Sequence, residues 1–194
     1  MNVDKRCDWC GTDPLEVRYH DEEWGVPCRD EARLFELLVL EGMQAGLAWI
    51  TILRKRENFR AALAGFDAEV IARYQDSDRQ RLLLDAGIVR NRAKVDAIIG
   101  NARATLSLRE RGDGLAGLLW SVVDGRPVQN QYRTIAEVPA STPRSEALSR
   151  RLRDAGFRFV GPTICQALMQ ATGLVNDHLL RCPRHRACAE LADV

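Results

Sequence analysis

Helix start and stop signals recur along the whole chain, and they constrain its fold more than any other feature. Residues typical of helix N-caps precede apolar positions spaced three and four apart, and glycines follow several of the last turns. The expected helices, cap residues included, run from Asp30 to Ala45, Asp67 to Tyr74, Ser77 to Asp85, Asn91 to Arg111, Thr142 to Gly156 and Gly161 to Gly173. We therefore predict an all-α protein.

Strand and loop signals are few. The alternation in residues 157–160 (FRFV) is the best strand candidate, and a pair of short strands is the most we expect. Gly, Pro, Asn and Thr cluster in residues 111–117 and 124–141, which we expect to be loops. The chain has 194 residues, 46% of them hydrophobic, and no linker-like segment divides it. We predict one domain over residues 1–194.

Charge and hydropathy exclude several classes of protein. The 28 Lys and Arg residues nearly balance the 27 Asp and Glu residues, so DNA binding would require a local basic patch. The longest charge-free stretch, residues 159–176, contains proline, threonine, glutamine and asparagine, which favours a buried helix over a membrane span. The first residues lack the apolar core of a secretory signal. We expect a cytoplasmic protein without membrane association, whose cysteines are thiols or metal ligands.

Cysteine and histidine residues near both ends of the chain form a candidate metal site. His20 follows Cys7, and His178 precedes Cys182 by four residues, a spacing that places both on one helix face. Pro183 disfavours helical geometry at Cys182, which we therefore expect at a frayed helix end. Two such pairs make a four-ligand structural zinc site, whereas three ligands and a water would make a catalytic one. Cys7 with Cys10, His185 with Cys188, and simple scattered thiols are the alternatives.

One carboxylate falls on the apolar face of the expected helix that follows Asp30. Glu41 lies on the same stripe as Leu34 and Leu37, and burial there raises a carboxyl pKa unless a partner holds the charge. The structural alternative is an ion pair with an arginine. Aromatic residues lie near Glu41 in the sequence or near the metal candidates: Trp9, Tyr19, Trp24 and Trp49. Such a set suits a flat or cationic base, although aromatic residues in helical proteins are usually core.

Two segments are candidates for contact with DNA. Gly46 ends the helix that carries Glu41 and leaves Leu47 in a turn, where it could act as an apolar wedge. Residues 82–94 read as a helix, a glycine turn at Gly87 and a second helix. The N-terminus of the second helix and the basic side chains near it could bind a DNA phosphate, so the candidate contact residues are Gly87, Arg90, Arg92 and Lys94. Residues 54–56 (RKR) are either a second backbone contact or an exposed turn.

Taken together, these motifs resemble a known family. They are Cys7 and residues 19–27 (YHDEEWGVP), 40–50 (LEGMQAGLAWI), 156–165 (GFRFVGPTIC) and 173–178 (GLVNDH). They closely resemble the bacterial 3-methyladenine DNA glycosylase I family, in order and over essentially the whole chain. The resemblance implies an all-helical glycosylase of the helix-hairpin-helix superfamily, with the hairpin at residues 86–91.

The resemblance also implies roles for individual residues. A structural Zn²⁺ falls on Cys7, His20, His178 and Cys182 and joins the two ends of the chain. The base pocket falls on Tyr19, Glu41 and Trp49, with Trp9 and Trp24 near it. Gly46 and Leu47 lie in the turn that enters the duplex.

The implied activity is excision of 3-methyladenine from alkylated double-stranded DNA, which initiates base excision repair and releases the free base. An adenine alkylated at N3 is already cationic, so it leaves as a neutral base with little help from a general acid. Glu41 would accept hydrogen bonds from the flipped base and assist catalysis, while Tyr19 and Trp49 stack on the ring. We expect a monomeric, monofunctional enzyme.

Two other functions are compatible with the residues alone. A zinc-stapled DNA-binding module without activity would keep its duplex affinity after Glu41→Gln and would release no base. A zinc hydrolase for another substrate would lose its chemistry without the metal while its fold remained intact.

Overall fold

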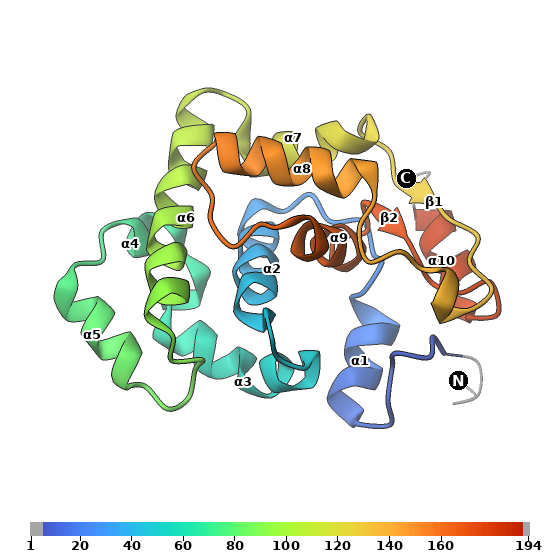
Figure 1. Cartoon of the computed structure of the whole chain (residues 1–194), viewed down its shortest axis with the longest axis horizontal. Helices are drawn as coiled ribbons and strands as arrows, with labels where there is room; N and C mark the ends of the chain where they lie inside the picture. The colour runs from blue at the N-terminus through green and yellow to red at the C-terminus, as the bar shows by residue number, and fades with distance from the viewer. Residues whose placement is uncertain (1–5, 192–194) are drawn as a thin grey trace.

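The computed structural model describes residues 6–191, and these residues form a helical domain (Figure 1). The ten helices are α1 (Pro14–Glu22), α2 (Glu31–Gln44), α3 (Trp49–Ala62), α4 (Ala68–Ala72), α5 (Asp76–Leu84), α6 (Arg92–Glu110), α7 (Gly114–Trp120), α8 (Pro143–Asp154), α9 (Pro162–Ala171) and α10 (Pro183–Leu191) within that range. Short 3-10 turns are η2 (Ala64–Phe66), η3 (Ser121–Val123) and η4 (Ile135–Glu137). No helix within residues 6–191 has the length and apolarity that a membrane span requires.

Helix α2 lies in the middle of the molecule, between α6 and α9 (Figure 1). It begins after Asp30, whose side chain accepts a hydrogen bond from the Arg33 backbone N–H, and all of its residues from Leu34 to Met43 are buried. A central helix of this kind exposes no polar face to water. Glu36 and Glu41 are therefore buried with its apolar residues.

The other predicted helices are confirmed with small shifts of their ends. Asn91 and Thr142 cap α6 and α8 through their side chains, and Asp67 caps α4. Ser77 is not the cap of α5, because the helix begins at Asp76 and its cap, Gln75, lies two residues before Ser77 and forms a capping box with Asp78. Four of the helices were not anticipated, namely α1, α3, α7 and α10. Of these, α1 carries His20 and α3 carries Trp49 near their ends.

Two predictions of local structure were wrong. Residues 114–117, which were expected to belong to a loop, form the start of α7, because the buried Leu115, Leu119 and Trp120 of this helix outweigh the low helix propensity of its glycines. Residues 157–160 form no strand. The short parallel strands are instead β1 (Val128–Gln129) and β2 (Val175–Asn176), with Val128 opposite Val175.

The His178 and Cys182 pair lies in a turn and not on one helix face. Strand β2 ends just before Asp177, and α10 begins at Pro183, so the two ligands lie between them. Proline suits the first turn of a helix, where its missing N–H has no partner to lose, and so Pro183 starts a helix here. The β1 and β2 pairing thus fixes the position from which His178 projects.

Candidate functional site

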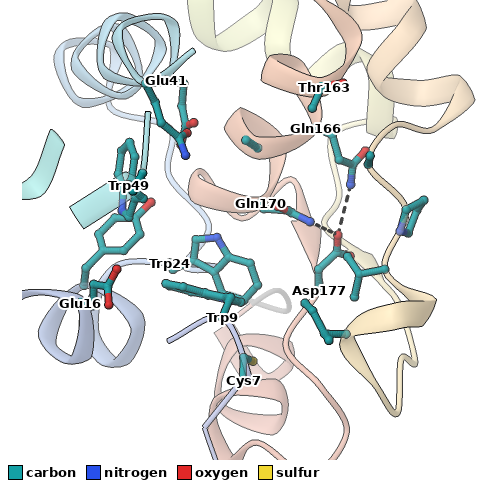
Figure 2. A pocket seen from close by; sticks show the side chains of 18 of the residues that line it. Cys7, Trp9, Glu16, Trp24, Glu41, Trp49, Thr163, Gln166, Gln170 and Asp177 are labelled. Carbon is teal, nitrogen blue, oxygen red and sulfur yellow. Dashed lines mark hydrogen bonds between the residues drawn. The ribbon is translucent and has the colours of Figure 1, made fainter. Parts of the chain in front are cut away.

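A cavity of about 560 Å³ lies between the first helices and the last third of the chain (Figure 2). One wall comes from α1, α2 and the start of α3, and the other from η4, the residues after it, and α9. The side chains that the sequence predicted for a base pocket all line this cavity: Trp9, Tyr19, Trp24, Glu41 and Trp49. Its volume is within the usual range for pockets that bind small molecules.

Glu41 is the most strongly perturbed acid in this wall. Its side chain lies in the buried part of α2, it is 4% exposed, and within residues 6–191 it has neither a hydrogen-bond partner nor an ion pair. Burial without a partner disfavours the carboxylate and raises the pKa of Glu41 to about 8. The expected alternative of an arginine partner is not what the structure holds; the buried arginine nearby, Arg56, pairs with Glu36 and Glu23. A cationic ligand would supply the missing counter-charge.

This burial makes a prediction about stability. The pKa of Glu41 rises from 4.5 to about 8 on folding, so the folded protein keeps a proton that the unfolded chain loses. Stability contributed by this group therefore falls as pH rises from about 4.5 to about 8. Glu41→Gln removes this titration. The free energy of unfolding of the variant should therefore equal that of the unmodified protein at low pH and exceed it by a few kcal/mol above pH 8, since each unit of pKa shift corresponds to about 1.4 kcal/mol. Denaturant unfolding of both proteins across this range measures it, and a difference that does not vary with pH would contradict it.

The aromatic residues form a continuous row along the same wall. The Tyr19 and Trp49 rings lie 5.1 Å apart between centroids, and the Trp9 and Trp24 rings lie 4.9 Å apart. Trp24 in turn packs edge-on against His178 at 4.5 Å. The indole N–H groups of Trp9 and Trp49 are buried and find no acceptor among the described residues 6–191. Buried donors of this kind cost free energy until they are paired, so a ligand that offers acceptors would satisfy them.

The opposite wall was missed by the sequence analysis. Thr163, Gln166 and Gln170 recur at helical spacing along α9 and face the cavity (Figure 2). Asp177 accepts hydrogen bonds from the side-chain amides of Gln170 at 2.7 Å, Gln166 at 3.1 Å and Asn130 at 2.6 Å. The signal was present in the charge-free stretch, whose amide and hydroxyl residues fall on one face of the helix.

Glu16 is a second residue that the sequence analysis did not select. It lies in the first turn of α1 and lines the cavity below Trp49 (Figure 2). Within residues 6–191 its carboxylate has no hydrogen bond or ion pair. It therefore adds negative charge at the aromatic wall.

The four predicted metal ligands come together beside the aromatic row. The ligand atoms of Cys7, His20, His178 and Cys182 all lie within 4.8 Å of one another, and all four residues are buried. Cys182 Sγ is 3.6 Å from His20 Nε2 and 3.7 Å from His178 Nδ1, and Cys7 Sγ is 3.4 Å from His178 Nδ1. Tetrahedral bonds of about 2.0–2.3 Å separate ligand atoms by about 3.3–3.8 Å, so the cluster could hold a metal ion.

The surroundings of the two histidines orient them for such an ion. His20 Nδ1 is 2.8 Å from Asp21 Oδ1, and Arg6 fixes that carboxylate. His178 Nε2 is 2.9 Å from the Trp24 carbonyl oxygen. Each ring thus uses one nitrogen outside the cluster and directs the other into it, as metal-bound histidines do.

The remaining cysteine and histidine candidates lie outside the cluster. Cys10 donates to the Gly11 carbonyl oxygen, and His185 is bonded to the Asn130 carbonyl oxygen. Cys188 is buried and contacts Arg184. The CxxC alternative, in which Cys10 would be a ligand with Cys7, does not fit this geometry.

The two predicted DNA-contact segments are exposed turns. Gly46 has a φ of +79°, which a side chain would disfavour, and Leu47 after it is 41% exposed. In the α5–α6 turn, a Cβ on Gly87 would lie 3.1 Å from Asn58 Cβ, so a side chain there would crowd Asn58. Arg90 and Arg92 are exposed and, within residues 6–191, belong to no ion pair.

Two basic side chains differ from the sequence-based expectation. Lys94 was predicted to bind phosphate, but it is buried, and its ammonium donates to the Met43 and Ala45 carbonyl oxygens at 2.8 and 2.7 Å. Residues 54–56 lie within α3 and form no turn, and Arg56 is buried in its ion pairs. Lys94 and Arg56 therefore do not face a phosphate backbone.

Comparisons with known proteins agree with this geometry. The family model of methyladenine glycosylase matches residues 9–185. DNA-3-methyladenine glycosylase 1 of Escherichia coli is 52% identical, over 92% of this chain and 95% of that protein. A crystal structure of 3-methyladenine DNA glycosylase I superposes with a TM-score of 0.90 and 52% identity, over 92% of this chain and 98% of that one. A tyrosine-to-phenylalanine variant of such an enzyme in complex with 3-methyladenine superposes with a TM-score of 0.89 and 35% identity, over 92% and 96% of the two chains. The chain therefore belongs to the methyladenine glycosylase family and is a DNA repair glycosylase for alkylation damage.

Proposed function

We propose that this protein flips 3-methyladenine out of alkylated duplex DNA and hydrolyses its N-glycosidic bond, the first step of base excision repair. The observation that carries the proposal is Glu41, a buried carboxyl group beside the aromatic residues of the cavity that has no partner within the described part of the chain. A related enzyme with a closely similar fold has been crystallised with 3-methyladenine. A cationic base in the cavity would favour the Glu41 carboxylate, which burial disfavours.

The reaction needs little proton transfer to the leaving group. The C1′–N9 bond breaks, its electron pair neutralises the cationic purine, and water adds to C1′ with loss of a proton to solvent. Glu41 accepts hydrogen bonds from the base and stabilises the positive charge that develops on the sugar, and so acts as the catalytic residue. Tyr19 and Trp49 stack on the base, with Trp9 and Trp24 beside them.

DNA binding would use the two exposed turns. The N–H groups at the start of α6, with Gly87, Arg90 and Arg92, bind phosphates without reading sequence. Leu47 enters the base stack from the α2–α3 turn and occupies the space that the flipped nucleotide leaves. We expect the protein to act in the cytoplasm as a monomer.

The metal in this proposal is a structural Zn²⁺ held by Cys7, His20, His178 and Cys182. Two thiolates and two imidazoles are a donor set that zinc prefers, and four protein ligands leave no open position for a reacting water. The ion would fix the N-terminal segment to the segment between β2 and α10, and so hold Trp9 in the cavity wall. A zinc hydrolase would require one ligand fewer.

The test is release of bases from methylated duplex DNA, followed by chromatography of the free purines. We expect rapid release of 3-methyladenine above the spontaneous rate. No release by folded protein would overturn the proposal, and retained duplex affinity in that case would favour the non-catalytic DNA-binding module.

The exposed position of Leu47 predicts how its removal affects base release. Leu47→Ala should lower the rate of release from duplex DNA about tenfold, because unstacking and unpairing the base costs a few kcal/mol. Its stability and its affinity for free 3-methyladenine should stay unchanged, since Leu47 is 41% exposed and outside the cavity wall. Leu191→Ala is the matched control, because Leu191 is 45% exposed in α10. An equal rate for the two variants would argue against a wedge.

A further inference from the structure

Two lysines join the turn that carries Leu47 to the turn of the α5–α6 hairpin. Lys94, in the first turn of α6, donates to the Met43 and Ala45 carbonyl oxygens at 2.8 and 2.7 Å. These are among the last carbonyl groups of α2, which have no partner within the helix. The ammonium group therefore holds the end of α2 from which Gly46 and Leu47 continue.

The second lysine makes the reciprocal connection. Lys55 lies in α3, which begins two residues after Leu47, and donates to the Ala86 and Gly87 carbonyl oxygens at 2.9 and 3.2 Å. The Asn58 amide adds a bond of 3.3 Å to the same Gly87 oxygen. The hairpin thus holds the helix before the Leu47 turn, and the helix after that turn holds the hairpin.

The position of Lys94 is unfavourable in its own helix. A cation in the first turn of a helix opposes the helix dipole, and Lys94 is only 8% exposed, so it also loses hydration. Burial lowers its pKa. Its neighbours Arg90 and Arg92 stay in solvent, where a basic side chain near a phosphate is expected. The compensating stabilisation comes from the C-terminal end of α2, where the negative end of the helix dipole favours the Lys94 ammonium.

We infer that Lys94 and Lys55 are positioning residues that keep the Leu47 turn in a fixed place relative to the phosphate-binding hairpin. The inference rests on the proposed function. When the hairpin binds DNA phosphates, a rigid connection presses Leu47 into the base stack. The free energy of binding to the DNA backbone then drives flipping of the damaged nucleotide. A loose connection would still bind the duplex, but it would misplace the wedge, and a displacement of about 1 Å can lower a rate about a hundredfold.

The experiment compares release of the same damaged base from single-stranded DNA and from duplex DNA, in which the base must first be unpaired and unstacked. Methylated poly(dA) is used as a single strand or annealed to poly(dT), and release of 3-methyladenine is measured under single-turnover conditions. Lys94→Met, which keeps the apolar stem, should be about ten to a hundredfold slower than the unmodified protein on the annealed polymer. On the single strand it should stay within about threefold, because less unstacking is needed there. Affinity for unmethylated duplex should be retained.

Lys55→Met should show the same bias and covers the case in which Lys94→Met does not fold. Arg103→Met is the matched control. Arg103 also lies in α6, nine residues after Lys94, and its side chain donates to the Ala72 carbonyl oxygen at the end of α4 instead of the end of α2 that leads to Leu47. It should show no bias between the two polymers.

Equal losses on both polymers would assign Lys94 to general stability and overturn the inference, as would no loss on either. If the unmodified protein releases no 3-methyladenine from either polymer, the proposed function itself fails.

Discussion

Glu41→Gln is expected to slow release of 3-methyladenine from methylated duplex DNA by about a hundredfold or more, the range seen when one group that stabilises developing charge is removed. Glutamine fills the same space but carries no charge. In a cavity from which water is largely excluded, the charge difference between a carboxylate and an amide acts on the cationic base with little screening. The measurement is the single-turnover release rate at equal metal content.

The same substitution separates loss of activity from loss of fold. Because the buried acid destabilises the folded protein above its usual pKa, the glutamine variant should be more stable at pH 8 and still much less active. Glu36→Gln is not a neutral control, since Glu36 pairs with Arg56. Glu57, which is exposed on α3 with a single ion pair to Arg60, is suitable, and Glu57→Gln should leave the rate unchanged. Unchanged release by Glu41→Gln would remove Glu41 from the reaction.

Removal of the metal should have the largest effect on stability. Structural zinc contributes about 10–16 kcal/mol to the folding of zinc-finger peptides, which is comparable with the entire stability of a typical domain. We expect one Zn²⁺ per chain, and we expect chelation or Cys182→Ala to lower the melting temperature steeply. Metal analysis and thermal unfolding before and after chelation measure both quantities.

Cys188 provides the control for this experiment. Its thiol is buried near the cluster but is not among the four ligands, so Cys188→Ala should retain the metal. A metal-to-protein ratio near zero in carefully purified protein would contradict the four-ligand site. Loss of activity on chelation without loss of stability would favour a catalytic metal.

Much of the fold could be predicted because helix caps are local signals. Asp30, Asn91 and Thr142 each precede a helix, and each side chain accepts a hydrogen bond from a backbone N–H of the first turn, as the sequence context predicts. Helix α3 escaped notice because its cap residue, Ala48, makes no side-chain bond. The β1 and β2 pairing was not predictable, because Val128 and Val175 are distant in the chain and each strand has two residues.

The candidate site was predicted unevenly for a similar reason. The sequence singles out Glu41 and the aromatic residues, which are unusual for their positions, and the structure brings them together. Amide residues such as Gln166 and Gln170 are ordinary on any helix, and only the fold shows that Asp177 lies opposite them. The hydrogen-bond partners of Lys94 depend on where the C-terminal end of α2 lies in the fold, and no local sequence pattern predicts that position.

The union of the two chain ends at the metal cluster also bears on how the protein is made. Cys7 and His178 are 171 residues apart, and the cavity wall takes Trp9 and Tyr19 from the first twenty residues and Asp177 from the last twenty. During synthesis the N-terminal segment emerges first, and its ligands Cys7 and His20 have no partner ligands until residues 178–182 have been translated. A nascent chain can therefore form α2 to α6 early, but it has no binding pocket. Activity should arise only after translation of the last ligand, Cys182, so that no partly synthesised chain can bind a damaged base.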